Sequence, residues 1–436
     1  MTHPQARIDW PDSHWLACTP ALATAAPLTD AIDTDAVVVG AGFTGLSTAW
    51  HLARAGVRTV LLEAMEPGWG ASGRNNGQVI PTLTRPDPDD IERLHGEAGA
   101  RFVALLRDSA QTLFDLVREA GLEAEAEQTG WIQPVHTPGR MKIAQRRVEQ
   151  WGRRGAPVEL LDAAAVRALT GSPVWHGGFT NRSGGHVNPL ALARSLAAAA
   201  QQEGVQRFDQ TPALTIGPRP GGWEIRTPMG RVHAQRLMLA THSYTDAFSA
   251  RLAPEIAREV VPVLSWQMAT GVVPEAVRER VIPGRQAVSD THGDLVFMRY
   301  DARHRLITGG ALVVPAAGAA RLRRRIGARL ARVFPDLGRA RFEHVWNGYI
   351  GMTTDFMPRL HRLGEGAFAW VGCNGRGVAL SIALGREFAR ALTGQAIQDL
   401  ALPLTGPRPL PAHAVLRRLA PLRLLHFRAL DNRELR

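Results

Sequence analysis

The most constraining feature of this sequence is a glycine-rich turn between a short strand and a helix. Residues 35–40 (DAVVVG) are typical of a buried strand, and residues 43–55 carry apolar side chains at helical spacing. The turn GAGFTG, residues 40–45, joins them, and residues 58–63 (RTVLLE) predict a second strand. This order is a β-α-β unit of about thirty residues. We therefore predict an α/β fold with a Rossmann-like domain near the start of the chain.

The glycines of this turn suit the binding of a dinucleotide. Gly40 allows the tight turn, Gly42 lets a pyrophosphate approach the helix N-terminus, and Gly45 permits close packing of helix and strand. Glu63, at the end of the second strand, can accept hydrogen bonds from both hydroxyls of an adenosine ribose. No arginine follows it to bind a 2′-phosphate, which disfavours NADP.

Other segments favour FAD over NAD. In residues 70–78 (GASGRNNGQ), Ser72 and Arg74 can hold a phosphate, although a plain soluble loop is the alternative. Residues 239–242 (LATH) end a strand, and residues 372–377 (GCNGRG) precede a helix whose N-terminus can stabilise a reduced flavin. The predicted cofactor-binding residues are Gly40, Gly42, Phe43, Thr44, Gly45, Glu63, Ala71, Ser72, Gly73, Arg74, Asn76, Gly77, Gln78, Ala213, Ala240, Thr241, Gly372, Asn374, Gly375, Arg376, Gly377 and Val378.

The strand–glycine–helix pattern recurs late in the chain, in residues 367–371 and 378–393. Residues 260–310 form short alternating runs between proline and glycine, which is typical of antiparallel strands. We predict a discontinuous FAD-binding domain and a mainly antiparallel α+β substrate domain. The expected boundaries are 1–34 for an irregular leader, 35–85, 155–245 and 345–400 for the FAD-binding domain, 86–154 and 246–344 for the substrate domain, and 401–436 for a basic tail.

The ionisable residues exclude several classes of chemistry. Lys142 is the only lysine, so a Schiff-base mechanism has only this residue, which lies in a segment typical of an exposed helix. Cys18 and Cys373 are the only cysteines, which excludes a disulfide framework and a cysteine-rich metal centre. Cys373 is expected to pack rather than react. We predict no metal site.

The net charge of +11 comes from arginine, concentrated in two segments. Residues 321–332 favour an amphipathic helix with a solvated basic face over a nucleic-acid surface. The tail contains PLRLLHFRAL, which is both basic and apolar and can lie on a partner or a membrane surface. The sequence contains no secretory signal pattern and no uncharged run of eighteen apolar residues, so we expect a cytoplasmic protein without a transmembrane span.

These motifs resemble the D-amino acid oxidase family of FAD-dependent amine and amino-acid oxidoreductases, and most of all its γ-glutamylputrescine oxidase-type branch. The resemblance spans about residues 35–400 and is carried by VVVGAGFTGLSTAWHLARAG, GWGASGRNNGQ, GGHVNPLALARSLAAAA, WNGYIGMTTDFMPRL and VGCNGRGVALSIALGREFARAL. It implies hydride transfer from the carbon bearing an amine to flavin N5, followed by hydrolysis of the imine. The implied electron acceptor is oxygen or a quinone.

The resemblance also implies the catalytic residues. The family often binds a substrate carboxylate with an arginine in a strand, and Arg299 matches that position; a surface arginine is the alternative. Tyr349 lies in a segment expected near the flavin, where it lines the pocket or packs in the core. Relatives that attach flavin covalently carry a cysteine in the segment matching residues 348–353, and this chain has none there, which implies noncovalent FAD.

The predicted function is oxidation of the C–N bond of an amine or amino acid, with a γ-glutamylputrescine-like or other amino-acid-derived amine as substrate. Two alternatives stay open. A flavoprotein domain acting in tRNA modification would explain the positive charge, although the basic stretches lack interleaved aromatic residues and nucleic acid is disfavoured. A non-catalytic flavin-binding subunit is the other.

Overall fold

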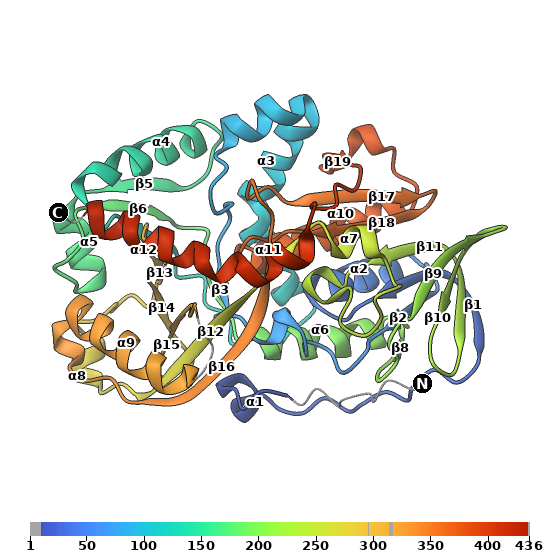
Figure 1. The fold of residues 1–436 in the computed structure, drawn as a ribbon, viewed down its shortest axis with the longest axis horizontal. Coiled ribbons are helices and arrows are strands. Elements are labelled where there is room, and N and C mark those ends of the chain that lie inside the picture. The colour runs from blue at the N-terminus through green and yellow to red at the C-terminus, as the bar shows by residue number, and fades with distance from the viewer. Residues whose placement is uncertain (1–9, 295, 314–316, 435–436) are drawn as a thin grey trace.

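Strands from both ends of the chain meet in the first sheet of the computed structural model, which describes residues 10–294, 296–313 and 317–434 (Figure 1). Its parallel centre has the order β18-β11-β1-β2. β2 and β18 are buried throughout, and β1 and β11 are buried over their final residues, where the runs of valine and leucine lie. The strands of this sheet are β1 (Ala31–Val39), β2 (Thr59–Leu62), β8 (Gln206–Phe208), β9 (Thr215–Arg219), β10 (Gly222–Arg226), β11 (Arg231–Leu239), β17 (Arg359–Gly364), β18 (Ala367–Val371) and β19 (Leu404–Thr405).

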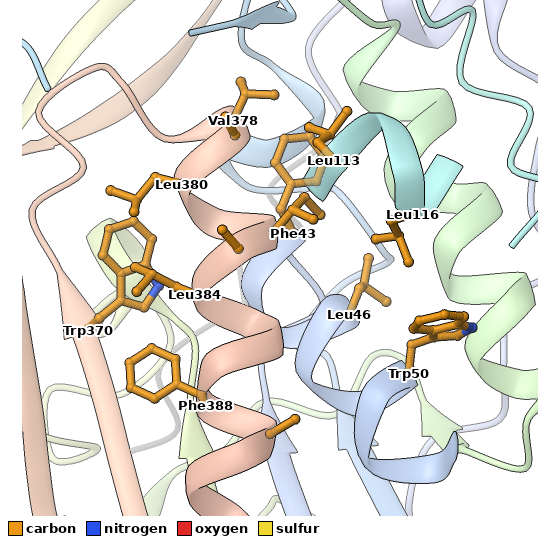
Figure 2. Packing of buried hydrophobic residues seen from close by; sticks show 14 of the residues in the cluster. Phe43, Leu46, Trp50, Leu113, Leu116, Trp370, Val378, Leu380, Leu384 and Phe388 are labelled. Carbon is orange, nitrogen blue, oxygen red and sulfur yellow. The ribbon is translucent and has the colours of Figure 1, made fainter. Parts of the chain in front are cut away.

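Helices from the two ends of the chain pack together beside this sheet. The side chain of Ser47 donates to the carbonyl of Ile382 at 2.9 Å, and a Cβ added to Gly385 would lie 2.5 Å from the Cβ of Ser47. Figure 2 shows apolar side chains of both helices in one cluster, including Leu46 and Trp50 of α2 (Phe43–Arg54) and Leu384 of α10 (Val378–Leu392). Helices α3 (Pro88–Glu119) and α6 (Pro189–Gln202) pack in the same cluster.

The second sheet is mainly antiparallel, as predicted, and has the order β16-β12-β15-β14-β13-β4-β6-β5. Its strands are β4 (Trp131–Pro134), β5 (Val158–Leu161), β6 (Gly178–Asn181), β12 (Val261–Val272), β13 (Ala287–Ser289), β14 (Phe297–Tyr300), β15 (Arg305–Gly310) and β16 (Phe342–Met352). The predicted amphipathic helix is α9 (Gly318–Val333), which buries Leu322, Ile326 and Leu330 at helical spacing. Further elements are α4 (Met141–Gly152), α5 (Ala163–Thr170), α7 (Pro254–Ala257), α8 (Glu275–Arg278) and the strand pair β3 (Gln78–Val79) and β7 (Gly185–His186).

Three segments depart from the predicted domain boundaries. β5 and β6 pair within the second sheet, although residues 155–245 were assigned to the FAD-binding domain. β16 also pairs there, with β12, although residues 345–400 received the same assignment. Conversely, α3 lies in the predicted substrate domain but packs in the same apolar cluster as α2 and α10. Long-range strand pairing decides these memberships, and local periodicity does not reveal it.

The predicted leader and tail are both ordered parts of the fold where the structure describes them. The leader contains α1 (His14–Cys18), and β1 begins at Ala31, before the predicted boundary. The tail forms α11 (His413–Leu419) and α12 (Arg423–Glu434). Residues 1–9 of the leader and 435–436 of the tail lie outside the described residues. Among the described helices, none combines the length and the apolar character needed to cross a membrane.

Candidate active site

A cavity of about 1110 Å³ lies where loops of the first sheet face strands of the second. Ligand pockets commonly measure roughly 300–1,000 Å³, so this volume gives room for a dinucleotide together with a small substrate. Most of the predicted site residues line it: Gly40, Gly42, Phe43, Thr44, Glu63, Ala71, Ser72, Arg74, Asn76, Gln78, Ala213, Ala240, Thr241, Tyr349, Asn374, Gly375, Arg376, Gly377 and Val378.

The turn between β1 and α2 has the close geometry that its glycines predict. Gly40 has a φ of 102°, in the region that glycine favours, and a Cβ added to Gly45 would lie 1.9 Å from the carbonyl oxygen of Gly40. Gly42 caps α2 without a side-chain acceptor. The amide of Phe43 donates to the hydroxyl of Ser72 at 3.0 Å. Residues 70–78 therefore reach the helix N-terminus, where amide groups favour a phosphate.

Glu63 has the position and the free capacity to bind ribose hydroxyls. Its carboxylate accepts from the amides of Ala41 at 2.7 Å and Met65 at 2.9 Å. A carboxylate offers about four acceptor positions, so capacity remains on the cavity side. Burial raises the pKa of Glu63 to about 7, and no cation pairs with it among the described residues. A polar carboxylate left in a cavity in this way fits a ligand that donates hydrogen bonds.

A second helix N-terminus faces the same cavity. Gly377 caps α10 without a side-chain acceptor. The loop before it is held by Asn374, whose amide oxygen accepts from the backbone of Thr353 at 2.8 Å. The imidazole of His242 accepts from the amide of Cys373 at 3.0 Å, and burial lowers the pKa of His242 to about 4. Burial also raises the pKa of the Cys373 thiol, so the thiol stays protonated at neutral pH.

Four predicted cofactor-binding glycines lie behind the wall of the cavity instead of lining it. They are Gly45, Gly73, Gly77 and Gly372. A Cβ on Gly73 would lie 2.3 Å from the carbonyl oxygen of Gly68, and one on Gly77 would lie 2.0 Å from that of Val187. These glycines permit close approach of backbones, and so shape the site without lining it.

Arg299 is not placed to bind a substrate, and this prediction is wrong. Its guanidinium donates to the carbonyl oxygens of Asn76 at 2.8 Å, Val187 at 2.7 Å and Tyr300 at 2.9 Å. It is 1% exposed, lies 4.8 Å from the ring of Trp15, and does not line the cavity. Arg299 therefore fixes the loop at residue 76 from beneath, and the alternative of a surface arginine is also excluded.

Tyr349 lines the cavity and is 40% exposed, which excludes core packing. Its ring lies 5.9 Å from that of Tyr244, whose hydroxyl accepts from the amide of Tyr349. Nearby, Arg74 packs 4.6 Å from the ring of Trp69 and donates to its carbonyl oxygen. The Nη2 of Arg74 is buried without a hydrogen-bond partner in the described structure, so it is available to a ligand.

Arg376 is the second buried arginine in the cavity wall with a free donor. Its guanidinium lies 4.7 Å from the ring of Trp131, and its Nη1 has no hydrogen-bond partner in the described structure. Only 6% of Arg376 is exposed, and no carboxylate pairs with it among the described residues. Burial lowers its pKa to about 9, so it stays charged at neutral pH.

The sequence analysis missed the side chains that the second sheet contributes. Gln267 of β12 and Ser289 of β13 line the cavity, as do Asp290 and His292, which hydrogen-bond each other at 2.6 Å. The ring of His292 stacks on that of His136 at 3.8 Å. Alternating residues predicted the strands, but which strand faces the cavity depends on sheet order, which has no local signal.

The comparisons with known proteins agree with a cavity that binds a dinucleotide cofactor. The DAO family model, described as FAD dependent oxidoreductase, matches residues 35–391. The chain is 30% identical over 371 residues to gamma-glutamylputrescine oxidoreductase of Escherichia coli (strain K12), which covers 85% of this chain and 86% of that protein.

Two solved structures share the fold. Glycine oxidase from Geobacillus kaustophilus superposes with a TM-score of 0.69 at 21% identity, covering 84% of this chain and 96% of that one. L-amino acid deaminase from Proteus vulgaris, with its specific insertion sequence deleted, gives 0.71 at 18% identity, covering 92% and 98%. With a family match over most of its length, this chain belongs to the DAO family of FAD-dependent oxidoreductases.

Proposed function

We propose that this enzyme oxidises the C–N bond of an amine that carries a carboxylate: an amino acid or an amino-acid-derived amine such as a γ-glutamylputrescine-like compound. The observation that carries the proposal is the buried, unpaired guanidinium of Arg376 in the wall of the cofactor cavity. The similarity to gamma-glutamylputrescine oxidoreductase supports the same substrate class.

Different residues of this chain bind different parts of the cofactor. The N-terminus of α2, beside the hydroxyl of Ser72, would hold the pyrophosphate, and Glu63 would hold the ribose. FAD, held noncovalently, supplies the hydride acceptor when it is bound. Tyr349 and Arg74 line the same cavity.

Arg376 suits a carboxylate for an electrostatic reason. An ionised group is costly to bury without a partner, and a bidentate carboxylate satisfies both the charge and the planar donors of a guanidinium. The ring of Trp131 fixes one face of Arg376, and Trp131 is itself held by a 2.8 Å hydrogen bond to Ser289. Arg376 thereby replaces Arg299 as the proposed anchor of the substrate carboxylate.

The test is anaerobic mixing of the FAD-loaded enzyme with amines, followed by the flavin absorbance. D-amino acids, N-methyl amino acids and γ-glutamyl derivatives of polyamines should bleach the flavin, whereas matched amines without a carboxylate should do so only at much higher concentration. Absence of bleaching by every amine tested would overturn the proposed activity. Peroxide formation in air would identify oxygen as the acceptor, and reduction of a soluble quinone would identify a dehydrogenase.

The charge distribution gives no support to the alternative in tRNA modification. Arg325 and Arg329 of α9 both pair with the buried carboxylate of Asp294, and Arg428 of the tail joins them. These three arginines therefore surround one carboxylate inside the fold, so they do not contribute to a surface for phosphates.

A further inference from the structure

The C-terminal segment, residues 413–434, is docked on the body of the molecule. Figure 1 shows α11 and α12 (red) running across one face, from the side of the first sheet to that of the second. The carboxylate of Asp431 is 5% exposed and accepts from the amide of Gly293 at 3.0 Å. Glu434 pairs with Arg140 at 2.7 Å. The segment therefore has a fixed inner side and a fixed outer side.

The inner side of the C-terminal segment forms part of the cavity wall. Most of its lining residues are apolar, among them Leu416, Leu419, Leu424, Phe427 and Leu430, and Arg423, His426 and Asp431 line the cavity beside them. Phe427 is also held by the guanidinium of Arg85, which lies 5.1 Å from its ring. The segment is thus a structural part of the site that holds flavin and substrate.

The outer side is also apolar. Six of the twelve large apolar side chains that are exposed in the described structure fall within residues 415–430. Three of them, Val415, Leu422 and Leu425, are 50–54% exposed and do not line the cavity. We call these three residues the outer face. The inner side borders the cavity, where Leu416, Leu419 and Leu430 are 37–51% exposed. The outer face is apolar and exposed without bordering the cavity, which is typical of a surface that contacts a partner.

Charge indicates which kind of partner covers the outer face. Arg418 follows Val415 by one turn of α11, and Arg433 follows Leu425 by about two turns of α12. Both arginines are exposed, and neither pairs with an acidic residue in the described part of the chain. A symmetric dimer through this face would bring like charges together, whereas anionic lipid headgroups would attract them.

We propose that the outer face binds the surface of a membrane containing anionic phospholipid, which places the cavity wall beside the bilayer. Leucine and valine side chains would enter the boundary between headgroups and acyl chains while the arginines contact phosphates. This surface is independent of the proposed amine oxidation, since it rests on residues outside the cavity.

The test uses the full-length, FAD-loaded protein and sedimentation with vesicles. We expect binding to vesicles of phosphatidylcholine mixed with phosphatidylglycerol, weak binding to phosphatidylcholine alone, and release by high salt. The double variant Leu422→Glu/Leu425→Glu should bind at least tenfold more weakly. The control Leu94→Glu/Val272→Glu adds the same charge at side chains 59% and 60% exposed elsewhere, and should bind like the wild type.

Retained flavin absorbance and melting temperature show that each variant is folded. Failure of the wild type to bind anionic vesicles, or equal loss of binding in both double variants, would overturn the proposal. A wild-type dimer that Leu422→Glu/Leu425→Glu converts to a monomer would also overturn it, because a second copy would then cover the outer face. Flavin reduction by amines is measured separately, so these outcomes leave the proposed activity untouched.

Discussion

At the scale of single residues, Glu63 makes the affinity for FAD depend on pH. Burial raises its pKa to about 7, and ribose hydroxyls donate best to the ionised carboxylate. We therefore expect FAD affinity to be constant above pH 7 and to fall by up to about tenfold for each pH unit below it, which is the limit for one proton. Quenching of flavin fluorescence measures this. Glu63→Gln should bind FAD weakly at every pH, and a flat wild-type profile would contradict the prediction.

Arg376→Gln should separate substrate binding from flavin binding. Loss of one partner of a buried ion pair costs about 3–5 kcal/mol, so the KM of a carboxylate-bearing amine should rise at least about 100-fold. The matched amine without a carboxylate should change little, and FAD affinity should persist. The control is Arg85→Gln, an exposed arginine in the same cavity, for which both amines should behave as in the wild type. Equal loss for both amines with weaker FAD binding would assign Arg376 to the flavin instead.

Arg299→Met should damage stability instead of substrate binding. The substitution leaves the buried carbonyl oxygens of Val187 and Tyr300 without this donor, each costing about 1–3 kcal/mol, and also the part-buried one of Asn76. The melting temperature should fall by several degrees, while the ratio of KM values for amines with and without a carboxylate stays constant. Kinetics of the folded variant below its melting temperature check this, and a KM increase confined to carboxylate-bearing amines would return Arg299 to the substrate site.

At the scale of elements, helix α1 is held to the second sheet by an ion pair that titrates. Burial lowers the pKa of His14, but hydrogen bonds with Asp301, at 2.6 Å, and Cys18 outweigh it and raise the pKa to about 9. The unfolded value is 6.5, so this stabilisation is complete below pH 6.5 and is lost as pH rises through about 9. The melting temperature should therefore fall across this window, and less so in His14→Gln. Parallel slopes in the two proteins would contradict the pairing.

The elements that could be predicted are those with a strong local signal. The turn at Gly40–Gly45, β18 and α10 follow from glycine spacing and apolar periodicity, and the structure agrees within one or two residues. α1 could not be predicted, since its five residues are too short for periodicity and its order depends on burying Trp15 against Trp346. The memberships of β5, β6 and β16 depend on strand partners far along the chain.

At the scale of the whole molecule, the site could be predicted on its cofactor side and not on its substrate side. Gly42, Ser72 and Glu63 belong to motifs in which the spacing of the residues indicates the role of each one. Gln267, Ser289 and the tail residue Phe427 reach the cavity only because separate elements are brought together by the fold. Arg299 shows the opposite error, since a position that matched a family pattern lies beneath the loop instead of in the cavity.

The packing of α10 against α2 has a consequence for how the protein is made. β18 pairs with β11, and α10 closes on α2 through Ser47 and Gly385, so the first nucleotide-binding unit lacks a central strand and a covering helix while most of the chain is still on the ribosome. Domains completed by late segments cannot finish folding during synthesis. We therefore expect flavin to bind only after residue 392 has left the exit tunnel, because the apolar layer between α2 and α10 is incomplete until then.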